Sequence, residues 1–219
     1  MTEPDPDDLT ARARIRDAAL RHFGEHGFDR STIRGIAETA GVSSGLVRHH
    51  FGSKEALRDA CDAHLAAALQ RINGRVRADS TPGDVNYVAV AGAAFGPYQR
   101  YVARALSEGR ATALFDTLVD LGAQWLAEAD TRRPDPPDVS TEARATVTAA
   151  MALSVSVLHQ HVSRRLGVDV LAPEGGDVLA RILLDIYSHP FLSPDEAAAI
   201  RSRLPATHTA PPRTEGHDD

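Results

Sequence analysis

The stretch STIRGIAETAGVSSGLVRHHFGSK, residues 31–54, decides the fold of this chain. It reads as two short helices joined by a turn, in which Gly41 suits a left-handed backbone and Ser43 can cap the next helix. Helices that cross steeply need a small residue at their contact, and Ala37 supplies it. The apolar residues at the inward positions are Ile36, Ala40, Val42 and Val47. The spacing predicts a helix-turn-helix, with a plain helical hairpin within a bundle as the alternative.

Further helices are expected on both sides of this motif. Sustained period-two alternation is absent and Ala, Leu and Arg dominate, so the fold class is predicted to be all-α. A first helix is predicted over 9–26, because Ile15, Ala19 and Phe23 recur every four residues. A helix over 54–77 follows the motif and leads into the rest of the chain.

The remainder is predicted to be a larger helical body. Gly and Pro breaks separate apolar periodic segments at about 84–95, 97–107, 110–129, 141–165, 177–188 and 194–204. The segment 141–165 is expected to be one helix of roughly 37 Å. Ser193, Pro194 and Glu196 have the pattern of a capping box at the start of the last helix. The expected organisation is a flexible acidic N-terminus (1–8), a helix-turn-helix domain (9–53), a larger helical domain (54–204) and a disordered tail (205–219).

The charge is distributed unevenly along the chain. The net charge is −6, yet residues 9–60 hold nine Lys or Arg against six Asp or Glu, while residues 61–219 hold 15 against 20. A basic module followed by an acidic body favours nucleic-acid binding by the module alone.

Several classes of protein are not expected. Cys61 is the only cysteine, which excludes an internal disulfide and a Cys-based metal site. No 18-residue apolar window predicts a membrane span, and the acidic N-terminus does not resemble a secretory signal. We therefore expect a cytoplasmic protein with no metal or cofactor.

The second helix of a helix-turn-helix places its N-terminal residues against base edges in the major groove. Ser43 and Ser44 can donate to phosphate or base, and Gly45 permits close approach. Arg48 could bind guanine through O6 and N7, bind phosphate, or remain a solvated arginine.

Two more residues suit a phosphate. Thr32 stands near the start of the preceding helix, where a hydroxyl and unpaired backbone N–H groups are available. Lys54, the only lysine, falls in the first turn of its helix, where the macrodipole disfavours a cation unless a phosphate is bound. A simple N-cap and a solvated lysine are the alternatives.

The segment STIRGIAETAGVSSGLVRHHFGSKEAL resembles the DNA-binding signature of the TetR family of bacterial transcriptional regulators, within a match of about 15–57. The resemblance implies a homodimer, a ligand-responsive body, and operator contacts by Thr32, Ser43, Ser44, Gly45, Arg48, His50 and Lys54. It places His50 on phosphate, whereas His49 is expected to be solvated or to pack. The family usually has tyrosine where this chain has Arg48, so its operator is expected to differ.

The resemblance also implies a cavity for an unidentified small-molecule effector among residues 61–165. Candidate lining residues are Phe95, Tyr98, Tyr101, Phe115, Trp125 and His159, with packing in the core as the alternative. The segments 141–165 and 177–188 would form a four-helix interface with their symmetry mates, or bury against their own body. In such a dimer, two helix-turn-helix modules about 34–36 Å apart would reach successive major grooves of a palindromic double-stranded operator.

The expected function is a ligand-responsive DNA-binding transcriptional regulator. We expect a repressor that its ligand releases from DNA, with activation of transcription as the alternative. The chain has no GxSxG, phosphate-loop or HExxH motif, so it is not expected to be an enzyme. The alternatives are a helical protein-interaction module or a small-molecule enzyme without DNA binding. Binding that falls steeply with salt would distinguish a DNA-binding protein from both.

Overall fold

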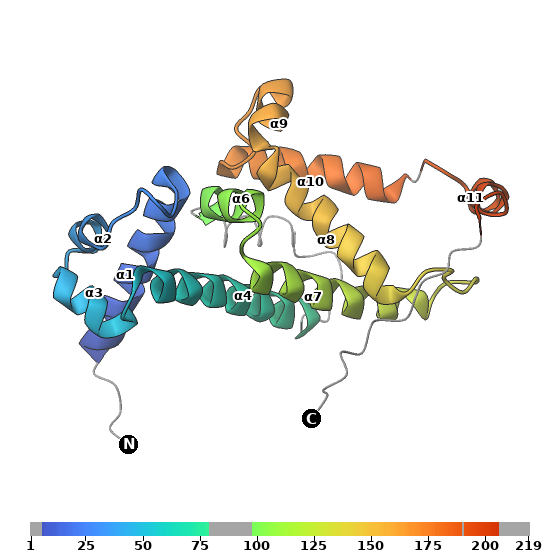
Figure 1. Ribbon diagram of the computed structural model, residues 1–219. Helices are drawn as coiled ribbons and strands as arrows, with labels where there is room; N and C mark the ends of the chain where they lie inside the picture. The colour runs from blue at the N-terminus through green and yellow to red at the C-terminus, as the bar shows by residue number, and fades with distance from the viewer. Residues whose placement is uncertain (1–5, 79–97, 190, 206–219) are drawn as a thin grey trace, which may run out of the picture. The chain divides into compact units, whose positions relative to one another are not determined.

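The computed structural model describes residues 6–78, 98–189 and 191–205, which form α-helices and turns with no strand among them (Figure 1). This confirms the all-α prediction. Residues 1–180 pack as one unit and residues 181–219 as another. The helices are α1 (Pro6–His26), α2 (Ile33–Ala40), α3 (Ser44–Phe51), α4 (Lys54–Ala78), α6 (Gln99–Ser107), α7 (Thr112–Asp130), α8 (Thr141–Val157), α9 (His159–Leu166), α10 (Pro173–Ser188) and α11 (Pro194–Arg201).

Helices α2 and α3 form the predicted helix-turn-helix. Gly41 ends α2 with φ 66° and ψ 39°, and its N–H donates to the carbonyls of Ala37 and Glu38. The left-handed backbone at this position explains the glycine, since a Cβ there would be strained. Ala37 is buried at the helix contact. Ser43 caps α3 by accepting a hydrogen bond from the backbone N–H of Leu46 at 3.1 Å.

A buried serine fixes the turn that leads into this motif. Gly27 follows α1 with φ 83°. The Ser31 hydroxyl lies 2.7 Å from the carbonyl oxygen of Gly27 and 3.0 Å from that of His22. Because the last carbonyls of a helix lack intrahelical partners, this side chain satisfies the end of α1.

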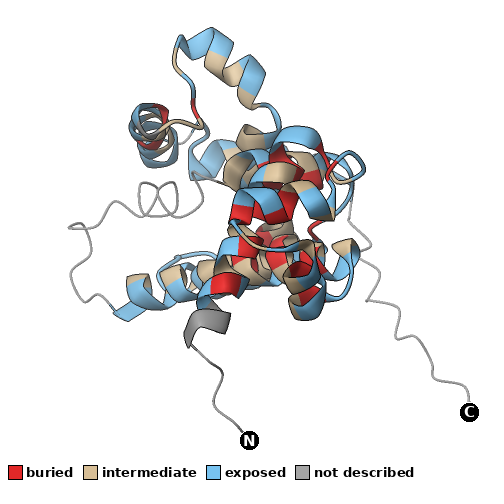
Figure 2. Cartoon of the chain, turned by 90° about the vertical axis from the view of Figure 1, so that its left-hand side faces the viewer, coloured by how far each residue is buried: buried red, intermediate tan, exposed pale blue. Residues whose placement is uncertain are grey.

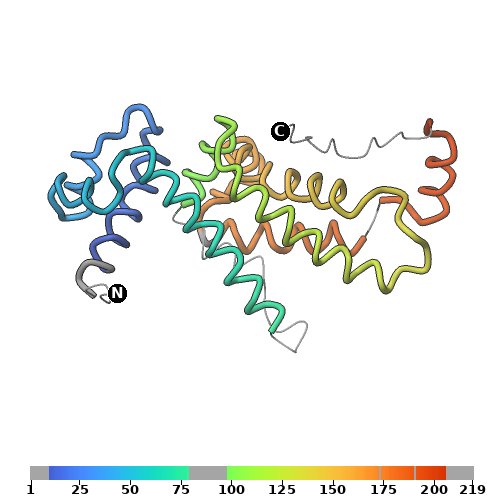
Figure 3. Tube along the Cα trace, turned by 60° about the horizontal axis from the view of Figure 1, so that its bottom comes forward, coloured from blue at the N-terminus to red at the C-terminus, as the bar shows by residue number. Residues whose placement is uncertain are grey.

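A single hydrophobic core runs from the helix-turn-helix into the body. Helix α4 lies along α7, and α6 packs against both α1 and α8 (Figures 1 and 3). The buried residues shown in Figure 2 gather where these helices meet. Core residues that share this cluster include Ile15, Val47, Leu57, Tyr101 and Leu114. The predicted domain boundary at 53/54 therefore falls at a turn through which the core continues.

The prediction of one helix over 141–165 is wrong. Helix α8 ends at Val157 and α9 begins at His159, with Leu158 at φ −92° and ψ 12° between them. The Nδ1 atom of His159 lies 2.8 Å from the carbonyl oxygen of Ser156, a carbonyl that an unbroken helix would offer to a backbone N–H. A hydrogen bond from the His161 N–H to the Leu158 carbonyl closes the turn at 2.9 Å.

Several helix boundaries also differ from the prediction. Helix α1 begins at Pro6, so residues 6–8 belong to it rather than to a flexible N-terminus. Helix α10 begins at Pro173, four residues early, and α11 ends at Arg201. The predicted capping box of α11 is present, with Ser193 and Glu196 as partners. The helix expected at 84–95 and tail residues 206–219 lie outside the described residues.

The approach of α1 to α6 depends on Gly24. A Cβ added to this buried glycine would lie 2.9 Å from the backbone nitrogen of Tyr101 and 3.3 Å from the carbonyl carbon of Arg100. Backbone atoms cannot swing aside as a flexible side chain can. The lack of a side chain at Gly24 is therefore what lets the two helices touch.

We predict that Gly24→Ala and Gly74→Ala have opposite effects on stability. Gly74 lies within α4, and nothing stands within 4 Å of the place where its Cβ would be. Alanine there should stabilise the fold by roughly 0.5–1 kcal/mol through helix propensity. Gly24→Ala should instead destabilise it by about 1–3 kcal/mol, because α1 and α6 are forced apart. Urea unfolding followed by circular dichroism measures both, and a stabilised Gly24→Ala would contradict the close contact.

Candidate nucleic-acid interface

Helix α3 presents an exposed polar face. Gly45 and Arg48 are exposed and Ser44 is half-buried, whereas Val47 and Phe51 are buried in the core. Arg48 makes no hydrogen bond or ion pair with any residue that the structure describes. The buried residues hold the helix in place, so the orientation of the polar face is set by the core.

The protein itself gives no reason for a glycine at position 45. A Cβ there would have only the Ser43 hydroxyl within 4 Å, at an ordinary 3.7 Å. Glycine within a helix is nonetheless roughly 1 kcal/mol less favourable than alanine. The lack of a side chain at this exposed position leaves room for another molecule to come close to the helix backbone.

Thr32 and Ser43 act as caps for their helices. The Thr32 oxygen accepts from the Gly35 N–H at 3.1 Å, as Ser43 does from Leu46. Neither hydroxyl donates a hydrogen bond to a described residue. Each proton is available to a phosphate oxygen beside the helix N-terminus, so capping and phosphate binding are compatible.

Lys54 has partners within the protein. Its ammonium donates to the carbonyl oxygens of Phe28 at 2.9 Å and Ser31 at 3.1 Å, and Nζ lies 4.3 Å from the centroid of the Phe28 ring. The sequence argument treated this cation as unfavourable at the start of α4 unless a phosphate was bound. The two carbonyls already offset the macrodipole, so Lys54 ties the loop after α1 to the start of α4.

The two histidines of α3 have different surroundings. His49 is exposed and His50 is half-buried. The His50 ring lies 5.5 Å from that of His49 and 6.2 Å from that of Phe51, both edge-on. The guanidinium of Arg12 covers the Phe51 ring at 5.1 Å. His50 therefore packs at the end of α3, close to a cation from α1.

Acidic residues stand only at the margins of this surface. None occurs between Glu38 and Glu55 in the sequence, and Glu38 is paired with Arg34 at 2.9 Å. The pKa of Glu55 lies below its usual range, first because a backbone N–H bonds to its carboxylate and then because the Ser53 hydroxyl does. The face of α3 is consequently cationic, as contact with a phosphate backbone requires.

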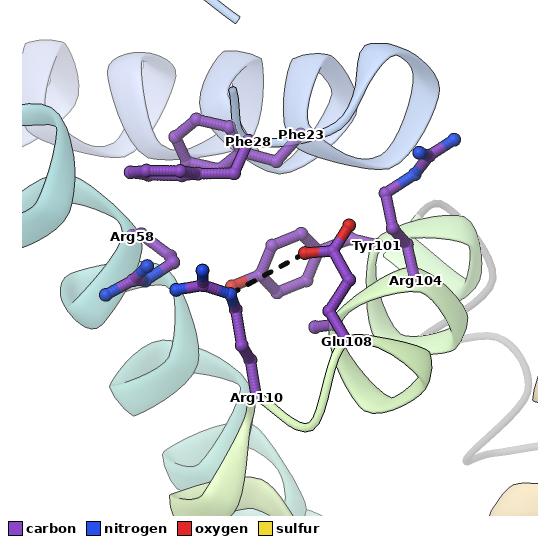
Figure 4. Close-up of a pocket in the computed structure, with 8 residues that line it drawn as sticks. Phe23, Phe28, Arg58, Tyr101, Arg104, Glu108 and Arg110 are labelled. Atoms are coloured by element: carbon purple, nitrogen blue, oxygen red, sulfur yellow. Dashed lines mark ion pairs between the residues drawn. The ribbon is translucent and has the colours of Figure 1, made fainter. Parts of the chain in front are cut away.

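A cluster around Phe28 links this module to the body (Figure 4). The guanidinium carbons of Arg58 on α4 and Arg110, which precedes α7, lie 4.7 and 5.7 Å from the Phe28 ring centroid. Arg110 also pairs with Glu108 at 3.6 Å. Cations on an aromatic face attract it electrostatically, so the loop after α6 is held to the loop after α1.

Arg104 and Tyr101 make the same link from α6. Arg104 donates from Nε to the Gly24 carbonyl at 3.2 Å, near the end of α1. The Tyr101 hydroxyl donates to Asp62 of α4 at 2.5 Å. Burial, followed by this hydrogen bond, raises the pKa of Tyr101, and burial raises the pKa of Asp62. Sequence reasoning missed Arg104 and Asp62, since no motif separates one arginine from 22 others.

The structure does not bring the predicted effector-binding residues together. Phe95 lies outside the described residues. Tyr101 is buried in the core, against Phe23 of α1 at 6.2 Å between ring centroids, and Tyr98 is half-buried at the edge of the same core.

Of the other three candidates, two line hollows that share Val157, and the third lies elsewhere. Phe115 lines an apolar groove and His159 a polar cleft. Trp125 is 41% exposed and donates from its indole N–H to Asn73 at 2.8 Å. No group of three or more His, Cys, Asp or Glu among the described residues could hold a metal ion. Within the same residues, no helix is long and apolar enough to cross a membrane.

Comparison with known proteins gives one family and several relatives. Residues 15–61 match the model of the bacterial regulatory proteins, tetR family. The chain is 39% identical over 123 residues to the HTH-type transcriptional regulatory protein RaaS of Mycobacterium tuberculosis, covering 55% of this chain and 58% of that one. It is 43% identical over 58 residues to the HTH-type transcriptional repressor Rv1474c of the same organism, covering 26% and 31%. The chain thus spans under two thirds of either relative.

Solved structures resemble this chain in fold beyond the helix-turn-helix, over the larger helical body as well. Salmonella enterica GusR superposes with a TM-score of 0.56 at 22% identity, over 86% of this chain and 99% of that one. At this identity the match concerns the fold alone.

We predict that Lys54→Met destabilises the fold by about 1–3 kcal/mol, because two carbonyls lose a charged donor. Arg48→Met, the matched control, removes a cation without partners and should leave stability within about 0.5 kcal/mol. Urea titration of both variants measures the difference. Equal stability of the two would show that the carbonyl contacts of Lys54 contribute nothing.

Proposed function

The chain belongs to the TetR family of bacterial regulatory proteins, and on that premise we propose that it is a cytoplasmic, ligand-responsive transcriptional regulator. It binds a palindromic DNA operator as a homodimer, represses, and is released by a small molecule. The observation that carries the proposal is the exposed face of α3, where Arg48 has no hydrogen-bond or ion-pair partner among the described residues and Gly45 leaves the backbone open. The names of the relatives RaaS and Rv1474c, a regulator and a repressor, support the same reading.

The residues of this face have distinct roles in the proposal. Arg48 reads a guanine through O6 and N7, and Gly45 lets the backbone of α3 approach the groove. Ser44 donates to a base or a phosphate, while Thr32, Ser43 and His50 contact phosphate. For Lys54 the third N–H of the ammonium is the one left for a phosphate, since two donate to carbonyls.

Helices α8 and α10 each carry exposed apolar side chains, and these support dimerisation. On α8, Val147 and Met151 are both 59% exposed. On α10, Leu184 is 63% and Tyr187 65% exposed. Large apolar side chains at such exposure favour a partner surface. We propose that each helix packs on its counterpart in a second copy, which sets the spacing of the two α3 helices.

Ligand release would act through the contact between α6 and α1. A ligand in the body that moves α6 also moves α1, because their backbones touch at Gly24 and Arg104 bonds across them. The two α3 helices then no longer match successive grooves. A coupling of about 1–3 kcal/mol between ligand and operator is typical of such a device.

Selection of bound genomic fragments, followed by salt titration, tests the proposed function. We expect fragments with two inverted half-sites and an affinity that falls steeply with salt. Arg48→Ala should lose its preference at one base pair per half-site, worth roughly 1–3 kcal/mol. Binding that is independent of salt and sequence would instead favour a protein-interaction module. Equal losses on operator and random DNA would place Arg48 on the backbone.

We predict that Gly45→Ala separates folding from DNA binding. The variant should be as stable as the parent or more so, since the Cβ has room and alanine favours the helix. Its operator affinity should fall at least about tenfold, because the methyl group stands in the interface. Gly74→Ala on α4 is the control and should keep full affinity. Unchanged operator affinity of Gly45→Ala would exclude close approach at this position.

A further inference from the structure

Two hollows in the body meet at one residue. The first is a groove of about 380 Å³, lined by apolar side chains that include Leu106, Phe115 and Leu153. The second is a cleft of about 430 Å³, lined largely by polar side chains from α6 and α9 and by the end of α1. Val157, the last residue of α8, lines both. An apolar surface therefore passes directly into a polar one.

The groove suits a hydrocarbon rather than a polar ligand. Ser154 is its one polar lining residue, and its hydroxyl already donates to the Met151 carbonyl at 2.6 Å. No side-chain donor that lines the groove is left to orient a ligand. Affinity there must come from apolar contact, which increases with the number of methylenes covered.

The cleft holds positive charge without an internal partner. Of its two carboxylates, Glu108 pairs with Arg110 at 3.6 Å, and Glu25 lies 3.9 Å from the ring nitrogen of His26, which is charged only when protonated. Arg100 is exposed and makes no hydrogen bond or ion pair with a described residue. Arg104 uses only Nε, on the Gly24 carbonyl.

His159 completes the wall of the cleft. Its Nδ1 lies 2.8 Å from the Ser156 carbonyl, so Nδ1 carries the proton and Nε2 is the remaining ring nitrogen. The two arginines supply the donors for a single anionic group, because a guanidinium binds a carboxylate through paired N–H donors.

We propose that the two hollows together bind an amphiphilic monoanion, such as a medium-chain carboxylate. Its tail lies on the Leu106, Phe115 and Leu153 groove, and its head lies between Arg100 and Arg104. The hollows are each within the size range of small-molecule sites. This inference rests on the proposed function only for its consequence, the release of DNA, and not for the site itself.

The site has a direct connection to the DNA-binding module. Arg104 lines the cleft and donates to Gly24 at the end of α1. An anionic head bound through the Nη groups pulls the same guanidinium toward the cleft and away from the Gly24 carbonyl. Filling the cleft therefore loosens the contact on which the position of α1 depends.

Calorimetric titration of the full chain with decanoate, below its micelle concentration and without DNA, tests the site. We expect saturable binding, with decan-1-ol at least about tenfold weaker because it lacks the charge. Octanoate should bind roughly fourfold to fifteenfold more weakly, since it lacks two methylenes. Equal affinity for decanoate and decan-1-ol, or no saturable binding of decanoate, overturns the proposal.

Two pairs of variants locate the ligand. Arg100→Gln should weaken decanoate binding by about tenfold, whereas Arg75→Gln, an exposed arginine on α4, should not. Val157→Glu places a carboxylate where groove and cleft meet and should abolish binding. Thr148→Glu adds the same charge at an exposed position of α8 away from both hollows and should bind normally. Equal effects within either pair place the ligand elsewhere and overturn the assignment.

Measuring DNA binding beside decanoate binding separates this inference from the proposed function. Decanoate binding that depends on Arg100, in a chain that binds no DNA, supports the site and contradicts the regulator. Salt-dependent DNA binding by a chain that does not bind decanoate contradicts the site and leaves the regulator intact. When both hold, decanoate should lower operator affinity in the parent and have about tenfold less potency on Arg100→Gln.

Discussion

The contact between α1 and α6 at Gly24 is the constraint on which the rest of the structure depends. The backbone of α6 comes so close that a single methyl group would collide with it. This approach lets Tyr101 reach the core beneath α1 and lets Arg104 reach the last carbonyls of that helix. The helix-turn-helix and the body consequently share one core, and a movement of α6 cannot leave α1 unaffected.

Cationic side chains fall into two groups according to their partners. Lys54, Arg58 and Arg110 surround the Phe28 ring and hold two loops together, and Lys54 also donates to two carbonyls in the loop after α1. Arg48 and Arg100 have no such partner among the described residues. Charge that the protein does not satisfy internally is what a ligand can recognise, so these two arginines carry the proposals for DNA and for an anion.

Local sequence signals predicted the helix-turn-helix correctly. They did not predict the break between α8 and α9, where a side chain competes with the backbone for a hydrogen bond. Gly41, Ser43 and the capping box at Ser193 act within four residues of themselves, so their roles were predictable from the sequence. The break at Leu158 was not, because the stretch contains no Gly or Pro and depends on the His159 ring competing for the Ser156 carbonyl. Among the aromatic candidates for the effector site, Tyr101 is buried in the core and Trp125 bonds to Asn73, whereas Phe115 lines the apolar groove.

The sequence by itself determined the helical class, the helix-turn-helix and the residues on its outer face, because periodicity, caps and turn glycines act over short distances. Only the tertiary structure decided which charges remain unpaired. It showed that Lys54 anchors carbonyls 23 and 26 residues away, a role that the sequence did not indicate. It also placed Arg100, Arg104 and His159 around one cleft. Partners so distant along the chain meet only when packing brings their helices together, and no local pattern records that meeting.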